Sequence, residues 1–271
     1  MELEPEQQVL FDRVMSYPYL PVVAVDVETA NKYPDSICQI AITWMEGQET
    51  YGLSFLIKPH TKKFEFTDIH GITYDDVKKS PRFAEVMDKY IFPILNKAQT
   101  ISAHYASFDM IAIEKSYELD SKSFIHIMDC PTKKIRDSCI LARVFLPDLP
   151  NHKLPTVCQA LNIPLIHHDA LSDAKASLQI VNWVMSNYAD YELHDLPMCM
   201  VTNEWAYKDM FFSPFNTPHG VTIMTPKQKA ELQRQAEDDA EAKEWVKNGI
   251  MVAFAAVSYT HLRAHETDSY L

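Results

Sequence analysis

Three short apolar runs, rich in β-branched residues, dominate the N-terminal part of the chain. The first is Pro21–Ala30, and it ends in two acids, Asp26 and Glu28. Residues 36–44 and 50–57 form the other two, and short turns join the three runs. Short apolar runs bounded by turns predict strands, and short connections predict an antiparallel meander.

Apolar residues at helical spacing predict the remaining elements. Residues 1–19 predict an N-terminal helix with Val9, Leu10, Phe11 and Val14 on one side. A second helix is predicted to begin at Pro81, because proline is favoured at the first helical position. The later elements are a strand at 98–104, a helix ending near 119, a short strand near 125–129, helices at 137–145 and 154–161, and a last helix that opens within 166–173 and runs to about 186.

The two acids at the end of the first run are unusual for a buried strand. Side chains two positions apart on a strand point the same way, so Asp26 and Glu28 project together. Carboxylates that close repel each other unless protons or cations lie between them, and hard divalent cations prefer such oxygen ligands. The Asp-x-Glu pattern alone does not show whether these acids form a metal site. The same pattern recurs at 190–192 and 239–241 in polar surroundings, where solvated charge explains it.

Further acids follow at the ends of other predicted elements. Asp109 comes just after the fourth strand, Asp173 lies in the first turn of the last helix, and His168 precedes it in the lead-in loop. Four acids around two cations suit phosphodiester hydrolysis, and a histidine can accept the proton of the attacking water. Singly, Asp109 could be a helix cap and His168 an ordinary surface histidine; together they favour a catalytic site.

Composition narrows the class of protein. The chain has 271 residues, a net charge of −12 and five cysteines without metal-site spacing. The negative charge argues against a protein that coats nucleic acid, and the few glycines lack the spacing of nucleotide-binding loops. Unpaired cysteines, no signal peptide and no membrane-spanning apolar stretch predict a cytoplasmic protein.

The motifs resemble those of the DEDDh 3′–5′ exonucleases, which include the epsilon-type proofreading exonucleases of bacterial replicative polymerases. The resemblance covers about residues 20–188 and rests on Asp26-Val27-Glu28-Thr29, His104-x-x-x-Phe108-Asp109 and His168-x-x-x-x-Asp173, with Ile69-His70-Gly71-Ile72-Thr73 and Asp137-Ser138-x-x-x-Ala142-Arg143 in support. His167 fits less well than His168, because the family spacing is His-x-x-x-x-Asp.

The resemblance implies an α/β, RNase H-like fold, with a five-stranded mixed sheet made of the three-strand meander and two parallel strands, flanked by helices. It implies two Mg²⁺ or Mn²⁺ ions held by four acids, His168 as general base, and release of 5′-mononucleotides from a 3′ end. The residues expected to be catalytic or to hold metal are Asp26, Glu28, Asp109, Asp173 and, as the base, His168. The residues expected to contact substrate are Thr29, His70, His104, Tyr105 and Phe108.

One position departs from the family. Asn commonly follows the histidine of the second motif, and Tyr105 stands there. Tyr105 could stack on a base or belong to the core, and the sequence leaves both open.

The leading functional expectation is a DNA-directed 3′–5′ exonuclease of the proofreading or repair type, acting on single-stranded 3′ ends beside a DNA polymerase and not on a membrane. The alternatives are a 3′–5′ exoribonuclease and a catalytically silent module that binds strand ends or a polymerase. Retention of all five catalytic side chains argues against the silent module.

The expected organisation is a helix at 1–19, the exonuclease domain at 20–190, and a C-terminal extension at 191–256. Residues 257–271 resemble the in-frame translation of a sequencing adapter, so we expect the native part of this sequence to stop near Ala255 and the true protein to continue further.

Overall fold

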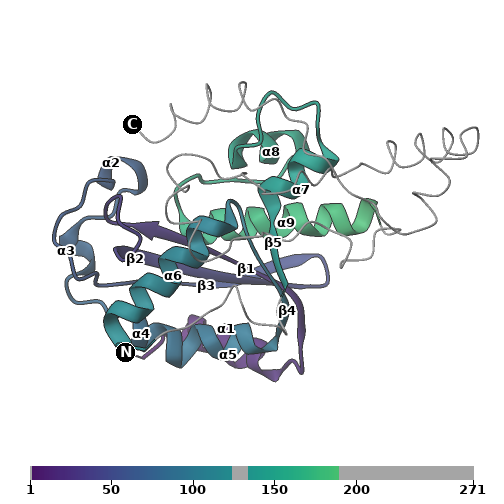
Figure 1. Ribbon diagram of the computed structural model, residues 1–271. Coiled ribbons are helices and arrows are strands. Elements are labelled where there is room, and N and C mark those ends of the chain that lie inside the picture. Colours follow the sequence, from purple (N-terminus) through teal and green to yellow (C-terminus); the bar gives the residue numbers. More distant parts are fainter. Residues whose placement is uncertain (1, 124–133, 189–271) are drawn as a thin grey trace, which may run out of the picture. The chain divides into compact units, whose positions relative to one another are not determined.

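A mixed sheet in the order β3-β2-β1-β4-β5 forms the centre of the protein in this computed structural model, which describes residues 2–123 and 134–188 (Figure 1). The strands are β1 (Leu20–Thr29), β2 (Ile37–Glu46), β3 (Glu49–Leu56), β4 (Ala98–Ala103) and β5 (Lys134–Asp137). β1, β2 and β3 pair in antiparallel fashion, while β4 lies parallel to β1 and β5 parallel to β4. The predicted three-strand meander with two parallel strands is confirmed.

Helices cover both faces of this sheet. They are α1 (Pro5–Ser16), α2 (Thr67–His70), α3 (Tyr74–Val77), α4 (Phe83–Val86), the π-helical turn η1 (Met87–Ile91), α5 (Phe92–Lys97), α6 (Ala106–Ser121), α7 (Ser138–Phe145), α8 (Leu154–Leu161) and α9 (Ala170–Asn187). Within the described ranges, no helix has the length and apolar composition needed to cross a membrane.

Three local predictions were wrong in detail. Val9 of α1 is 66% exposed, so the buried side of that helix is narrower than expected. The helix expected at Pro81 begins at Phe83, because the Pro81 carbonyl accepts a hydrogen bond from the Lys58 N–H at 2.9 Å and holds the chain extended. Asp137 ends a strand and caps the next helix, where the sequence predicted the first helical residue.

Several predicted segments lie outside the described residues. They are the short strand near 125–129, the C-terminal extension at 191–256 and the tail at 257–271.

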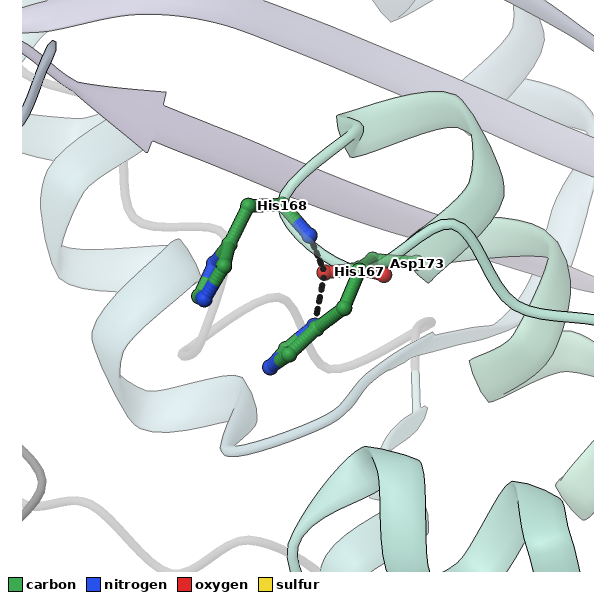
Figure 2. Close-up of side chains that lie close together, drawn as sticks. All are labelled: His167, His168 and Asp173. Atoms are coloured by element: carbon green, nitrogen blue, oxygen red, sulfur yellow. Dashed lines mark hydrogen bonds and ion pairs between the residues drawn. The ribbon is translucent and has the colours of Figure 1, made fainter. Parts of the chain in front are cut away.

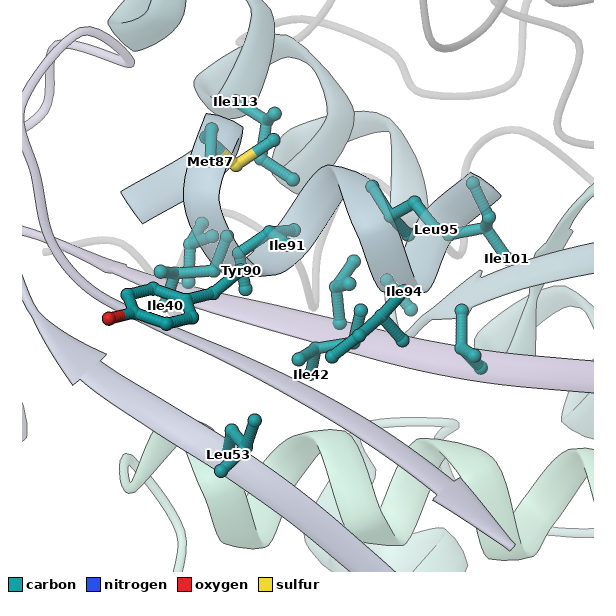
Figure 3. Close-up of a cluster of buried hydrophobic side chains, with 14 of the residues drawn as sticks. Ile40, Ile42, Leu53, Met87, Tyr90, Ile91, Ile94, Leu95, Ile101 and Ile113 are labelled. Atoms are coloured by element: carbon teal, nitrogen blue, oxygen red, sulfur yellow. The ribbon is translucent and has the colours of Figure 1, made fainter. Parts of the chain in front are cut away.

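The main apolar core lies on one face of the sheet, under α1, η1 and α5. Alternate residues of β1, such as Val23 and Val25, and of β2, such as Ile40 and Ile42, point into it. Figure 3 shows Ile40 and Ile42 of β2 below Tyr90, Ile91, Ile94 and Leu95 of the helical segment. Because side chains alternate along β1, the residues between the valines, including Asp26 and Glu28, point to the opposite face.

That opposite face is covered by α9, and small residues allow the helix to lie close to it. Ala41 of β2 packs with Ala170 and Ala174 of α9, and the Thr43 hydroxyl donates to the Ala174 carbonyl at 3.3 Å. At Gly52 of β3, an added Cβ would lie 2.7 Å from Leu171 Cδ1 and 2.8 Å from the Ile42 carbonyl oxygen. A glycine inside a strand thus marks the close approach of α9.

Candidate active site

Three acids from distant parts of the chain meet on the α9 face of the sheet. Asp26 and Glu28 project from the end of β1, and Asp173 lies in the first turn of α9. One carboxylate oxygen of each lies within 4.8 Å of one from each of the other two. The expectation that Asp26 and Glu28 point the same way and that Asp173 joins them is confirmed.

The fourth acid, Asp109, is buried beside this group. It lies in the first turn of α6, and its Oδ1 accepts a hydrogen bond from the Val27 N–H at 3.1 Å. Val27 is the residue between Asp26 and Glu28, so this bond fixes α6 to the end of β1 that carries the two acids. Its position alone suggested a helix cap, but Asp109 also links α6 to β1.

The electrostatics of the cluster are unfavourable without a counter-charge. Burial, then the charges of Asp109 and Asp173, raise the pKa of Asp26 well above its usual range. Burial and the charges of Asp173 and Asp169 raise the pKa of Glu28 to about 8. Burial also raises the pKa of Asp109, although the Val27 N–H opposes that shift. Such shifts are typical of functional sites.

These residues fit divalent cations. The donors are carboxylate oxygens, the ligands that Mg²⁺ and Mn²⁺ prefer. Asp173 Oδ1 is buried and has no hydrogen-bond partner among the described residues, which leaves it available to a cation. Cations bound between the acids would remove the repulsion that raises their pKa values.

Two adjacent histidines lie beside Asp173 in the loop before α9 (Figure 2). His167 Nδ1 lies 3.0 Å from Asp173 Oδ2, and the backbone N–H of His168 donates to the same oxygen at 3.1 Å. The two rings stack with centroids 3.8 Å apart. The structure confirms that His168 lies in the lead-in loop, but it is the ring of His167 that contacts the carboxylate.

His168 differs electrostatically from the expectation for a histidine beside acids. Burial, then His167, lower the pKa of His168, and they outweigh the opposing charge of Asp173. The neutral imidazole, the form that can accept a proton, is therefore favoured near neutral pH.

His70 and Thr29 contact each other, and their expected contact with substrate stays a prediction. His70 Nε2 donates to the Thr29 carbonyl at 3.1 Å, and Nδ1 accepts from the Ile72 N–H at 3.0 Å. The Thr29 side chain is buried at the end of β1. The pair fixes the turn at Gly71, whose φ of +77° confirms the predicted tight turn, to the strand that carries the acids.

His104 has protein partners on both ring nitrogens. Nδ1 lies 2.8 Å from the Ser138 hydroxyl, and Nε2 lies 2.9 Å from the His152 carbonyl oxygen. Burial lowers the pKa of His104 to about 4, so the ring is neutral. Phe108 packs against the main core. Direct substrate contact by either residue stays a prediction.

Tyr105 adopts a backbone conformation that explains why asparagine is common at this place. Its φ is +69°, in the left-handed region that asparagine tolerates better than bulky residues do. The Tyr105 hydroxyl accepts from Arg143 at 3.1 Å, and the Tyr105 N–H donates to Asp137 at 3.1 Å. These contacts hold the tyrosine beside the start of α6, and its role toward substrate stays a prediction.

Sequence reasoning from the residues overlooked two helix-capping acids. Asp137 accepts backbone hydrogen bonds from Tyr105, Ala106, Cys139 and Ile140, and so joins β5, α6 and α7. Asp169 caps α9 through the Ser172 N–H at 2.8 Å. An acid just before a helical pattern is the signal that could have revealed both caps.

Comparison with known proteins agrees with this geometry. The family model RNase_T, described as "Exonuclease", matches residues 23–181, which contain all of the acids described above. The chain belongs to this exonuclease family. Part of this chain is 32% identical, over 161 residues, to the PolC-type DNA polymerase III of Oceanobacillus iheyensis, a match that covers 57% of this chain and 11% of that protein. The corresponding protein of Bacillus cereus is 29% identical over 180 residues, covering 64% and 12%.

The matched segment therefore spans only about a tenth of the length of these curated relatives. Solved structures with some similarity include exonuclease I in complex with an inhibitor, with a TM-score of 0.47 and 15% identity, covering 64% of this chain and 43% of that one. The RNase domain of the yeast Pop2 protein has a TM-score of 0.49 and 10% identity, covering 72% and 92%.

Proposed function

We propose that this exonuclease hydrolyses phosphodiester bonds at DNA 3′ ends and releases 5′-mononucleotides. The observation that carries the proposal is the meeting of Asp26, Glu28 and Asp173, with Asp109 beside them, inside a chain of the exonuclease family. Residues that lie 147 positions apart, from 26 to 173, converge on one point of the sheet. Asp109 and Asp173 are buried and Asp26 and Glu28 are half-buried, and acids that serve only as surface charge have no reason to be gathered in this way.

In this proposal, Asp26, Glu28, Asp109 and Asp173 hold two divalent cations, Mg²⁺ or Mn²⁺. When bound, such ions stabilise the charge that develops on the phosphate and lower the pKa of the attacking water. Burial raises the pKa of these acids when no metal is bound. Burial also lowers the local dielectric constant, which strengthens the attraction between each carboxylate and a bound cation.

His168 is the proposed general base. Its neutral form is favoured, its ring lies in the loop directly before the metal-binding helix, and its backbone is fixed by the bond from its N–H to Asp173. His168 takes the proton from the attacking water and passes it to solvent, since the loop is at the surface. Substrate positioning is assigned to Thr29, His70, His104, Tyr105 and Phe108 around the site.

The choice of DNA and the polymerase context are supported by the relatives. The curated matches are named DNA polymerase III, and the matched segment is a small part of each. We infer that this chain acts beside a DNA polymerase and removes nucleotides from single-stranded 3′ ends. Among the described residues, Cys38 and Cys158 are buried thiols outside any disulfide, which supports a reducing compartment such as the cytoplasm.

The test is digestion of matched DNA and RNA single strands that differ only in the sugar, labelled at the 5′ end, with Mg²⁺. We expect stepwise shortening of DNA from the 3′ end, release of 5′-mononucleotides, and complete loss of activity in EDTA. Faster shortening of RNA would favour the exoribonuclease alternative. Binding of 3′ ends without release of nucleotides would favour the silent module.

A further inference from the structure

The adjacent histidines before α9 make two different contacts with Asp173, and only one of these uses a side chain. His167 Nδ1 lies 3.0 Å from Asp173 Oδ2, whereas His168 reaches the same oxygen at 3.1 Å through its backbone N–H (Figure 2). Because an ionised carboxylate can only accept hydrogen bonds, His167 Nδ1 carries the hydrogen in this contact. Asp173 Oδ2 is therefore held by two donors from neighbouring residues.

The two carboxylate oxygens of Asp173 have different contacts in this arrangement. Oδ2 receives both hydrogen bonds, while Oδ1 is buried and has no hydrogen-bond partner among the residues that the structure describes. A carboxylate fixed through one oxygen presents the other in a defined direction. Asp173 shares its cluster with Asp26 and Glu28, so this direction determines how well it completes the acidic group.

The loop itself is held in a conformation that a histidine seldom adopts. His168 has a φ of +67°, in the left-handed region. Two further bonds close the loop onto α9: the Ile166 N–H donates to the Ser172 hydroxyl at 2.8 Å, and the Asp169 N–H donates to the Ile166 carbonyl at 3.2 Å. The turn places the two imidazole rings in a stack with centroids 3.8 Å apart and planes 21° from parallel. His167 thus contacts both Asp173 and the ring of His168.

We propose that His167 is a positioning residue, which orients Asp173 through its Nδ1–H and supports the ring of His168 by stacking. This inference rests on the proposed function for the roles of Asp173 and His168. It gives His167 no proton transfer of its own. The chemistry that it supports is the binding of a divalent cation by Asp173 and the presentation of His168 to the attacking water.

Substitutions that keep or move the donor test this role. In His167→Asn, the amide nitrogen occupies the place of Nδ1, so the bond to Asp173 is retained. In His167→Gln the amide nitrogen lies farther out, near the place of Nε2, and in His167→Ala there is no donor. His60→Ala is the matched control, since His60 is also a partly exposed histidine in contact with an aspartate, Asp120, and lies outside the catalytic group.

Three measurements are made on each full-length variant: kcat and KM on single-stranded DNA with Mg²⁺, the Kd for Mn²⁺ by calorimetry, and the melting temperature in EDTA. We expect His167→Ala and His167→Gln to weaken Mn²⁺ binding or lower kcat by about 10–100-fold, the usual effect of losing a residue that orients a metal ligand. KM should change little. His167→Asn should recover most of the loss, and His60→Ala should match wild type.

Rescue by asparagine but not by glutamine is the outcome that a merely structural role does not produce. Wild-type kcat and Mn²⁺ affinity in His167→Ala would overturn the inference, and so would a His167→Asn variant no better than His167→Gln. If the wild-type protein releases no nucleotides, the proposed function is wrong. In that case, the Mn²⁺ affinities of the His167 variants still test the positioning role by themselves. Equal affinities in wild type and all His167 variants would overturn that role.

Discussion

Glu28 couples the stability of the metal-free protein to pH. Burial and the charges of Asp173 and Asp169 raise the pKa of Glu28 from an ordinary value of 4.5 to about 8. The native state therefore binds this proton more tightly than the unfolded state does. Stability from this group is fully present below pH 4.5 and is lost as the pH rises toward 8.

The size of the effect follows from the same shift. One pKa unit corresponds to about 1.36 kcal/mol, so raising the pH from 4.5 to 7 removes about 3 kcal/mol of unfolding free energy through Glu28. For a domain of this size, this corresponds to a fall of about 6–12 °C in melting temperature. The glutamine side chain in Glu28→Gln is neutral at every pH, so this variant should not show the fall in melting temperature that Glu28 causes. Because Glu28 also raises the pKa of Asp26, the substitution weakens the pH dependence of that neighbour too.

The assay is thermal unfolding in EDTA between pH 4.5 and 8, comparing wild type, Glu28→Gln and the control Glu49→Gln. Glu49 is an exposed glutamate at the start of β3, and its substitution should leave the pH dependence unchanged. Adding Mn²⁺ to wild type should remove most of the fall, because the cations compensate the charge of the acids. If Glu28→Gln loses as much stability between pH 4.5 and 7 as wild type, the electrostatic reasoning is wrong.

Four other predictions concern the same face of the sheet. Asp26→Ala and Asp173→Ala should abolish nucleotide release while their metal-free forms melt at the wild-type temperature or above, because each removes a repelling charge; wild-type turnover in either would contradict the site. Mn²⁺ at one hundred times its Kd should stabilise wild type by about 2.7 kcal/mol and Asp26→Ala far less, as measured by melting; equal shifts would place the ions elsewhere. His168→Ala should lower the rate by about 10²–10⁴-fold while Mn²⁺ affinity in calorimetry stays near wild type; loss of metal binding as severe as in Asp173→Ala would make His168 a ligand. Gly52→Val should lower both melting temperature and activity, because its Cβ would meet the Ile42 carbonyl oxygen, Thr43 Cγ2 and Leu171 of α9; unchanged values would refute that packing argument.

The sequence alone determined the elements and the acids that they carry. The run that ends in Asp26 and Glu28 forms β1, and the two acids share one face, because the two-residue period of a strand is a local property. The same holds for Asp173 in the first turn of α9, since a helix start depends on neighbouring residues. The motif resemblance added the expectation that these acids meet.

Only the tertiary structure decided how they meet. Asp173 reaches β1 because Ala41, Gly52 and Ala174 let α9 lie close to the sheet, and no local pattern states which small residues will face each other. The ring that contacts Asp173 belongs to His167, whereas His168, which the family spacing favoured as the base, reaches the carboxylate through its backbone N–H at a left-handed turn. Such contacts join residues far apart in the chain or depend on one backbone angle, so they are fixed by packing and hydrogen bonding in the folded state.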